Sequence, residues 1–282
     1  MTAASPPRPS RRGLLKLAAS TGAAALAAGI YGRWVEVERL TLERPWVPLP
    51  GIPAGPKPLR VGFLTDLRLD DERAVERARR AVAMLLADRP DVVLLGGDYV
   101  SRPGRGSARA VDCLEALADV PGGVFAVLGS HDWWRGEALA VARRLSEMGF
   151  QVLRNRSVEL AAAPGLWLTG LDDRCVNRQQ PDAALKRVPR HAPRILLIHE
   201  PDYADETPAG FVLQVSGHSH GGQVRVPGIR PLHLPRHARR YPEGLQRAAR
   251  HPVCTSRGVG VIGTRSRLFC PPEVTVLELA EG

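Results

Sequence analysis

The sequence lacks the patterns that would assign it to several common protein classes. It has only four cysteines, Cys113, Cys175, Cys254 and Cys270, and no Cys-x-x-Cys pair, which argues against a zinc site built on thiolates. It has no zinc-finger spacing and no aromatic residues interleaved with a basic motif, so nothing indicates a specific nucleic-acid partner. Internal repeats, coiled-coil heptads and low-complexity domains are also missing. What remains is an ordinary globular composition, with 282 residues, 44% of them hydrophobic, enough for one large core.

The chain carries a formal net charge of +10, and its positive residues are mostly arginines spread along the sequence. A solvated basic surface is the interpretation that we favour. Attraction to a membrane surface of anionic lipid, or to phosphate-rich envelope polymers, is the second.

The N-terminal segment resembles a twin-arginine export signal. Residues 10–16 read Ser-Arg-Arg-Gly-Leu-Leu-Lys and precede an Ala-rich stretch, residues 17–30, which is shorter than the roughly 20 residues of a membrane span. We therefore predict that residues 1–30 are a signal or an N-terminal anchor, that the twin-arginine translocation machinery is a partner, and that the protein resides in the periplasm or on the outer face of the cytoplasmic membrane. The alternative is a disordered tail that runs into an ordinary helix.

The rest of the chain predicts an α/β fold. We expect an initial strand and connector over residues 31–57, with the strand at 35–42, and then one catalytic domain over residues 58–282. A strand–helix alternation predicts strands at 60–65, 92–95 and 123–128 and helices at 72–86, 108–118 and 135–148. Strands then dominate, which predicts a mixed β-sandwich flanked by helices. The later strands are expected at 158–160, 166–169, 195–198, 211–215, 223–226, 259–262 and 274–279.

Five candidate metal ligands follow short apolar runs: Asp66, Asp98, His199, His218 and His220. Strands buried on both faces read as apolar runs, and ligands collect beyond their carboxyl ends. An Asp at a strand end often only caps the next helix, and a lone His is more often structural. Five such residues together favour a metal site. Carboxylates with imidazoles suit Zn, Mn or Fe better than Ca.

These motifs resemble those of the calcineurin-like metallophosphoesterases, over residues 58–279. The resemblance rests on Asp66-Leu67-Arg68, Gly97-Asp98, Gly129-Ser130-His131-Asp132, His199 and Gly217-His218-Ser219-His220, in that order. Residues 199–202, 217–224 and 256–260, followed by Pro272-Glu273, look like the bacterial branch of phosphodiesterases exported by the twin-arginine pathway. The resemblance implies a four-layer α/β/β/α sandwich of mixed sheets and one or two divalent ions, Mn, Fe, Zn or Co.

Two departures from the family pattern fall on positions that bind metal. The resemblance assigns Asp66, bridging Asp98 and His220 to the first ion, and Asp98, His199 and His218 to the second. Arg68 stands where the family has an imidazole, and Ser130 stands where it has an amide. Arg68 cannot donate a lone pair. In one interpretation, which we favour, its charge replaces part of the first ion and contacts the phosphoryl oxygens. In the other, Arg68 pairs with Asp66 and the first site is dead.

Other residues are predicted to act on the substrate. His131 resembles the family residue near the leaving group, where a protonated imidazole would assist departure, and Asp132 is predicted to cap the following helix. Arg68, Ser130, Arg102 and Arg105 are candidate substrate contacts. Residues 227–252 are a candidate lid or rim, although for this stretch, as for the loop that carries Arg102 and Arg105, a solvated loop is the interpretation that we favour.

The function predicted from the sequence is a metal-dependent hydrolase of phosphoric esters, a phosphodiesterase or pyrophosphatase, acting at the cell envelope. Its substrate would be a phosphodiester or a nucleotide-linked small molecule or lipid. The alternative is a degenerate, non-catalytic envelope protein that binds phosphate groups. Pairing of Cys254 with Cys270 is left open for a location outside the cytoplasm.

Overall fold

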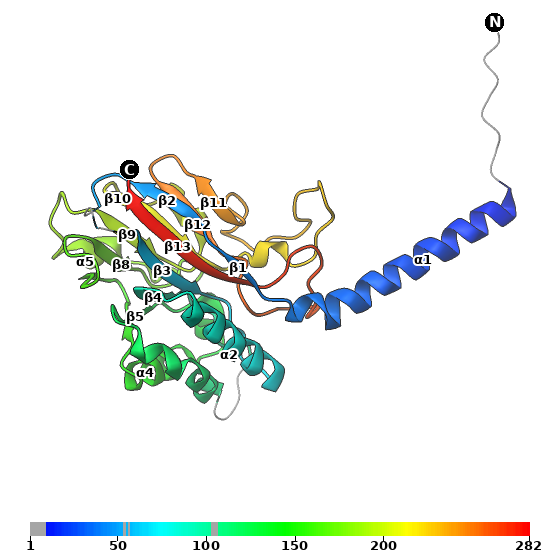
Figure 1. Cartoon of the computed structure of the whole chain (residues 1–282), viewed down its shortest axis with the longest axis horizontal. Coiled ribbons are helices and arrows are strands. Elements are labelled where there is room, and N and C mark those ends of the chain that lie inside the picture. Colours follow the sequence, from blue (N-terminus) through cyan, green and yellow to red (C-terminus); the bar gives the residue numbers. More distant parts are fainter. Residues whose placement is uncertain (1–9, 53–54, 56, 103–106) are drawn as a thin grey trace, which may run out of the picture.

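Two β-sheets lie face to face at the centre of the computed structural model, which describes residues 10–52, 55, 57–102 and 107–282 (Figure 1). The first sheet has the strand order β1-β13-β3-β4-β5-β6, and β2 also pairs with β13. Strands β3, β4, β5 and β6 are parallel, whereas β13 runs antiparallel to β3. Its strands are β1 (Thr41–Glu43), β2 (Trp46–Leu49), β3 (Leu59–Leu64), β4 (Val92–Leu95), β5 (Val124–Ala126), β6 (Gln151–Val152) and β13 (Glu273–Glu281).

The second sheet has six strands in the order β11-β12-β10-β9-β8-β7. Its four central strands are parallel, and the two edge strands run antiparallel to their neighbours. They are β7 (Arg156–Glu159), β8 (Trp167–Gly170), β9 (Arg194–Leu197), β10 (Phe211–Ser216), β11 (Gly244–Arg247) and β12 (Pro252–Thr255). Both sheets are therefore mixed, as predicted.

Alternation along the central strands builds two separate cores. In β3 and β4, Phe63 and Leu94 point into the core between the sheets, whereas Leu64 and Leu95 point to the opposite face. In β9, Leu197 joins the core between the sheets and Leu196 packs on the outer side. Because both faces of these strands are covered, their sequences read as continuous apolar runs.

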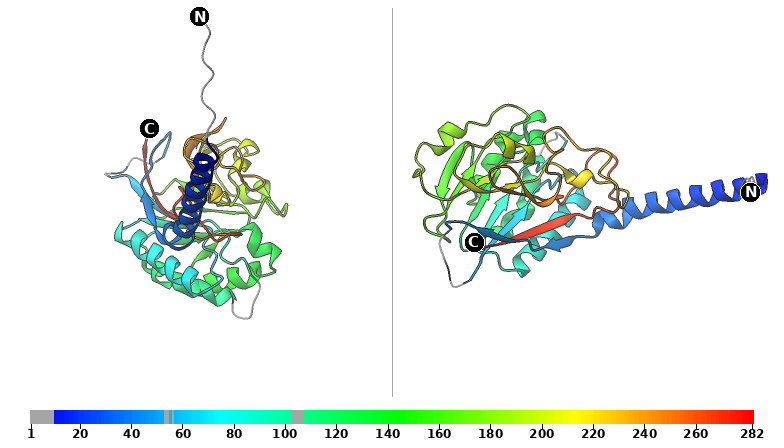
Figure 2. Two further views of the ribbon diagram at one scale, coloured as in Figure 1. Left: turned by 90° about the vertical axis from the view of Figure 1, so that its right-hand side faces the viewer. Right: turned by 90° about the horizontal axis from the view of Figure 1, so that it is seen from above.

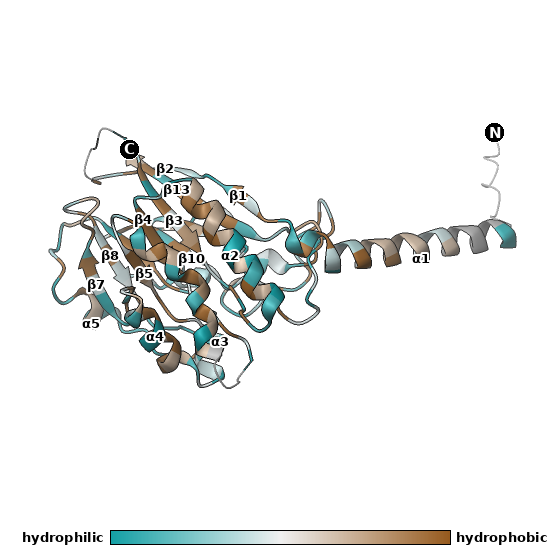
Figure 3. Cartoon of the chain, turned by 60° about the horizontal axis from the view of Figure 1, so that its bottom comes forward, coloured by the Kyte–Doolittle hydropathy of each residue, from teal (hydrophilic) through white to brown (hydrophobic). Residues whose placement is uncertain are grey.

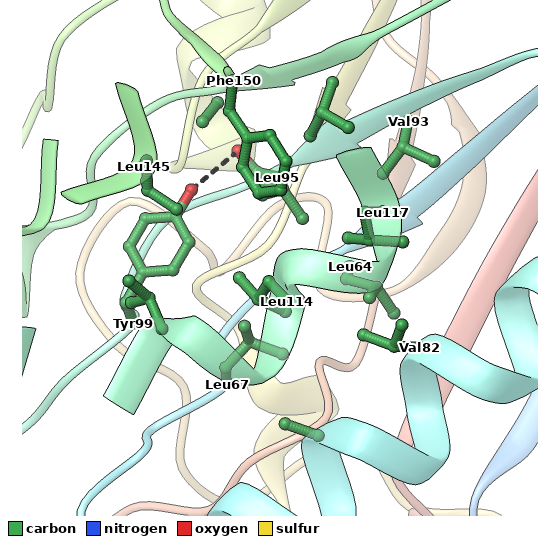
Figure 4. Packing of buried hydrophobic residues seen from close by; sticks show 14 of the residues in the cluster. Leu64, Leu67, Val82, Val93, Leu95, Tyr99, Leu114, Leu117, Leu145 and Phe150 are labelled. Carbon is green, nitrogen blue, oxygen red and sulfur yellow. Dashed lines mark hydrogen bonds between the residues drawn. The ribbon is translucent and has the colours of Figure 1, made fainter. Parts of the chain in front are cut away.

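Helices cover the outer face of each sheet, which completes the predicted four layers. On the first sheet lie α2 (Glu72–Ala87), the 3-10 helix η2 (Ser107–Asp119) and α4 (Ala138–Glu147). Figure 4 shows this core, where Val82, Leu114 and Leu145 meet residues of β3 and β4. The second sheet has a thinner cover of α5 (Pro181–Leu185) and η3 (Pro201–Asp205). In Figure 3, hydrophobic colours gather on the central strands, and α2 has hydrophilic turns on its outer side.

Helix α1 (Arg11–Trp34) projects from one end of the body (Figures 1 and 2). Its last turn is tied to the body: Arg33 Nη1 donates to Thr264 O at 3.0 Å, and Gly32 O accepts from Arg267 N at 2.9 Å. Across the described part of the chain, we find no helix that combines the length and the apolar character needed to cross a membrane.

The structure corrects several predictions. Residues 35–42 are not one strand, because α1 continues to Trp34 and is followed by the 3-10 helix η1 (Glu36–Glu38) before β1 begins. The predicted connector contains β2, so residues 41–49 belong to the first sheet. Residues 223–226 and 259–262 form no strand, and the predicted helix at 135–148 is divided at Gly136 between α3 (Ser130–Trp134) and α4. β6, α5, β11 and β12 were not predicted. All four cysteines are free thiols, so Cys254 and Cys270 are not paired.

Candidate active site

The predicted ligands converge because they follow parallel strands at the same edge of the two sheets. Asp66 and Asp98 follow β3 and β4, and His199 and His218 follow β9 and β10. The loop after β5 brings Ser130 and His131 to the same edge at the start of α3. The two sheets thus supply opposite halves of one site.

The main chain turns sharply at this edge. Asp66, Arg68, Asp98, His218 and His220 all have left-handed backbone conformations, with φ between 50° and 68°. Non-glycine residues seldom adopt this conformation, and such strain concentrates at functional sites. Here it turns each side chain away from its strand direction and into the space between the sheets.

Glycine is required where the two halves of the site meet. A Cβ atom on Gly217 would lie 2.2 Å from Thr65 Oγ1 and 2.5 Å from Asp66 Oδ2. A Cβ atom on Gly129 would lie 2.4 Å from Asp98 Oδ1. A larger residue at Gly217 or Gly129 would collide with Asp66 or Asp98, so only glycine fits at these two positions.

Asp98, His199 and His218 form a buried set of donors whose ligand atoms all lie within 4.8 Å of one another. His199 Nδ1 lies 2.7 Å from Gly96 O, and His218 Nε2 lies 2.9 Å from Arg236 O. A carbonyl oxygen only accepts, so both of these ring nitrogens carry hydrogen. The lone pairs are therefore on His199 Nε2 and His218 Nδ1, and backbone carbonyls commonly orient metal-binding imidazoles in this manner.

The geometry and charges of this set fit a divalent cation. His199 Nε2 lies 2.9 Å from Asp98 Oδ2, and His218 Nδ1 is buried with no hydrogen-bond partner in the described structure. Burial opposes a charged His199, but the Asp98 and Asp66 carboxylates outweigh it and raise the pKa of His199 well above its usual value. A divalent ion fits this donor set, with three protein ligands and an open position.

The neighbouring position is filled by Arg68. Its Nη2 lies 3.3 Å from Asp66 Oδ1 and 3.2 Å from His220 Nε2, and it also pairs closely with Asp98 Oδ2. These three atoms belong to the residues that the sequence assigned to the first ion. Burial opposes ionisation of Asp98, but Arg68 and His199 outweigh it and lower the pKa of Asp98. The guanidinium is only 3% exposed.

Ser130 and His131 lie against Asp98 on the open side of the site. The His131 N–H donates to Asp98 Oδ1 at 2.8 Å, and Ser130 Oγ is buried without a partner among the described atoms. Burial, followed by the charge of Arg68, lowers the pKa of His131 to about 4. The lowered pKa favours a neutral ring, whereas the role predicted for His131 requires a protonated one. A phosphoester bound beside it would add negative charge and raise that pKa.

Asp132 does more than the predicted capping. Its carboxylate accepts from the Gly129 N–H at the start of α3, as a cap does. It also accepts from the N–H groups of Asp98, Tyr99 and Val100, at 3.0, 3.0 and 3.3 Å. Asp132 thus fixes the turn that presents Asp98.

A cleft of about 190 Å³ opens over the site. Residues 227–252 contribute part of its rim, as predicted, through His233, Pro235 and Arg236. Arg102 is exposed and does not line this cleft, and its own N–H donates to Asp70 Oδ1. Arg105 lies outside the described residues. The residues that line the cleft are Arg68, His131, Trp134, Cys175, His218, Ser219, His220, Gly222, Gln223, His233, Pro235, Arg236 and Ile262.

The sequence analysis missed a second acidic cluster behind His199 and His218. Glu200 accepts from the N–H groups of Arg174 and Cys175, and burial together with the Glu200 carboxylate raises the pKa of Asp173 to about 10. Asp173 follows β8 at the same edge of the sheet, which is the signal that could have identified it. The cluster orders the loop that carries Cys175, whose Sγ lies 3.9 Å from His218 Nε2.

The chain is similar to a known family and to several bacterial proteins. The family model for the calcineurin-like phosphoesterase matches residues 59–222. The uncharacterized metallophosphoesterase YkuE of Bacillus subtilis is 30% identical, over 96% of this chain and 97% of its own length. The phosphodiesterase YaeI of Escherichia coli is 33% identical, over 79% of this chain and 82% of its own. A solved dimetal phosphatase from Danio rerio is a more distant likeness, with 13% identity and a TM-score of 0.47 over 79% of this chain and 94% of that one.

Proposed function

Because the chain belongs to the calcineurin-like phosphoesterase family and is a metallophosphoesterase, we propose that it hydrolyses phosphodiester or pyrophosphate bonds at the cell envelope. The observation that carries the proposal is the buried set of Asp98, His199 and His218, whose ligand atoms lie within 4.8 Å of one another and of which His218 also lines the cleft. Mixed carboxylate and imidazole donors suit Mn, Fe, Zn or Co.

A bound ion of this kind supplies a hydroxide at neutral pH and stabilises charge on the phosphoryl oxygens. The chain's own residues supply the rest. Arg68 presents a fixed positive charge to a phosphoryl group that enters the cleft. His131, also in the cleft wall, faces the departing oxygen and stabilises it once the bound phosphoester has raised its pKa. Ser130, next to His131 in the chain, has a buried hydroxyl without a partner among the described atoms, and we assign it to orienting water or a phosphoryl oxygen.

The size of the cleft and the residues on its rim favour a phosphodiester that enters only in part over a large ligand that the cleft would enclose completely. A volume of about 190 Å³ is below the roughly 300–1,000 Å³ of pockets that enclose drug-sized ligands. The phosphoryl group fits inside, and the two ester groups extend over the rim, where Trp134 is 56% exposed. The name of the related YaeI, a phosphodiesterase, supports the same substrate class.

Location at the envelope is supported by the N-terminal motif and by exposed apolar side chains near α1. Arg11 and Arg12 begin α1. Near its other end, the 224–232 and 264–269 loops adjoin through the bridge between Val224 and Leu268. The last turns of α1 and these loops carry exposed apolar side chains of the kind that a membrane surface binds. They are Ile30, Tyr31, Trp34, Val35, Val224, Val226, Ile229, Leu232 and Phe269.

The first experiment is hydrolysis of bis(p-nitrophenyl) phosphate by metal-stripped full-length protein, titrated with Mn²⁺, Zn²⁺ and Co²⁺. We expect metal-dependent turnover that is lost in Asp98→Asn. Asp112→Asn is the matched control, because Asp112 forms an ion pair with Arg144 at the surface, away from the cleft. Absence of turnover with every ion, and with a pyrophosphate substrate, would favour the alternative of a protein that binds phosphate without catalysis.

Export is tested with the same full-length chain. We expect fractionation of a producing bacterium to find the protein outside the cytoplasm, and the double change Arg11→Lys, Arg12→Lys to retain it inside. An unchanged distribution in the double variant would refute the twin-arginine route.

A further inference from the structure

We propose that this protein binds one catalytic ion and that the guanidinium of Arg68 permanently occupies the position of a second. The proposal rests on the proposed function, since it concerns the same site. It explains how the chain can lack an imidazole at position 68 and still keep the carboxylates and the histidine that would surround a first ion.

The atoms around Arg68 Nη2 are those that would surround an ion. Asp66 Oδ1, Asp98 Oδ2 and His220 Nε2 all lie within hydrogen-bond distance of this one nitrogen. The three residues are all at most 3% exposed, and His220 Nε2 is itself 3.1 Å from Asp66 Oδ1. An ion in this position would need the space that Nη2 already fills.

Arg68 is also held so that it cannot easily leave. Its other terminal nitrogen, Nη1, donates to Ser101 Oγ at 3.1 Å, and its main-chain N–H donates to Asp98 O at 3.2 Å. The left-handed backbone at Arg68, with φ of 53°, directs the side chain inward. Moving it out would remove the guanidinium that pairs with the buried carboxylates of Asp66 and Asp98, which is costly.

The position that Arg68 fills and the position formed by Asp98, His199 and His218 differ in charge. The first position already holds the positive charge of the Arg68 guanidinium. A divalent ion there would meet this charge at contact distance. In the other position, formed by Asp98, His199 and His218, the described contacts of Arg68 reach only the Asp98 carboxylate. Of these two positions, one can therefore take an ion and the other cannot.

The test counts bound ions. Metal-stripped full-length protein is titrated with Mn²⁺, and bound Mn²⁺ is followed by electron paramagnetic resonance and by elemental analysis after dialysis. We expect one tightly bound Mn²⁺ per chain with the spectrum of an isolated ion. Arg68→His restores an imidazole and should bind two, with the spectrum of an exchange-coupled pair. His218→Ala, in the wild-type background, should lose the single ion.

Two saturable ions per wild-type chain, or one in Arg68→His that melts normally, would overturn the proposal. If Arg68→His does not fold, the wild-type count still decides. The count is independent of turnover. A protein that binds one ion but hydrolyses nothing would contradict the proposed function and leave this proposal standing.

Discussion

Asp132 holds the main chain of Asp98 in place: its Oδ2 accepts the Asp98 N–H at 3.0 Å from the start of α3, 34 residues along the chain. The same carboxylate accepts the N–H groups of the next two residues. Its partners are main-chain groups, so the bond constrains the turn itself. The position of a candidate ligand in one βα unit therefore depends on a residue from the next.

Asp132→Asn is expected to weaken metal binding. The amide keeps the size of the carboxyl group but presents N–H on one side, so at least one of the four main-chain donors loses its acceptor. We expect metal affinity to fall about 10- to 100-fold, as for other residues that support a ligand, and unfolding free energy to fall by about 1–3 kcal/mol. Isothermal titration with Zn²⁺ and urea denaturation measure the two effects. Asp112→Asn is the surface control, and equal affinity in both variants would refute the role.

His131→Gln should slow catalysis according to the leaving group. If His131 stabilises the departing oxygen, its removal lowers kcat about 100-fold or more for a diester with a poor leaving group. The effect is smaller for p-nitrophenol, which departs readily without help, and KM changes little. Steady-state kinetics on the two esters separate these outcomes. Exposed His191→Gln is the control, and an equal loss on both esters would assign His131 to binding or positioning instead.

Gly217→Ala should disrupt the site without any change of charge. The added methyl group would overlap Thr65 Oγ1 and Asp66 Oδ2. We expect a loss of about 1–3 kcal/mol in unfolding free energy, typical of overpacking, together with weaker metal binding. Thermal melts and metal titration measure both. Gly29→Ala in α1, where an added Cβ meets nothing within 4 Å, is the matched control. A Gly217→Ala variant that behaves like the control would show that the loop can shift freely.

Asp71 should stabilise α2 in a pH-dependent manner. It accepts the Ala74 N–H at 2.9 Å and pairs with Arg265. Partial burial opposes ionisation, but these two groups outweigh it and lower the pKa of Asp71. A lowered folded-state pKa adds stability above the unfolded value near 3.8, and this is lost as pH falls through the folded pKa.

We therefore expect Asp71→Ala to cost about 1 kcal/mol at pH 7. Asp71→Asn keeps the cap and should cost less. Urea denaturation of the three proteins at pH 7 and at pH 3 provides the comparison. A cost for Asp71→Ala that is the same at both pH values would contradict the ionic part of the argument.

The positions of the strands that are buried on both faces could be predicted from the sequence. Residues 92–95 and 195–198 read as apolar runs because each successive side chain enters a different core, and the strands form within one residue of the prediction. β2 was missed because Pro48 lies in a short strand, Trp46–Leu49, that pairs only with the end of β13, where proline is tolerated.

Two segments that were predicted as strands form none, one because of its backbone geometry and the other because of its tertiary contacts. The run at 223–226 is apolar enough for a strand, but Gln223 has a φ of 54° and only Val224 forms a bridge. At 259–262, the N–H groups of Val259 and Gly260 donate to the carbonyls of Thr65 and Asp66, so the segment braces the site instead of joining a sheet. Such tertiary contacts leave no periodic signal.

For the site, the sequence identified which residues meet but not how they meet. Strand ends predicted the convergence of Asp66, Asp98, His199 and His218. Both interpretations of Arg68 remained open, because choosing between them requires the direction of its side chain. That direction depends on a left-handed turn and on Ser101, and neither could be inferred from residue types alone.

The left-handed residues around the site also bear on how the purified protein must be handled. Each such residue costs on the order of 1–3 kcal/mol, and a whole domain is stable by only about 5–15 kcal/mol. An ion that binds the folded site alone offsets this strain through mass action. A storage buffer that contains a chelator should therefore destabilise the folded protein mildly. The protein should then unfold at a lower temperature and be digested faster by proteases, whether or not activity is measured.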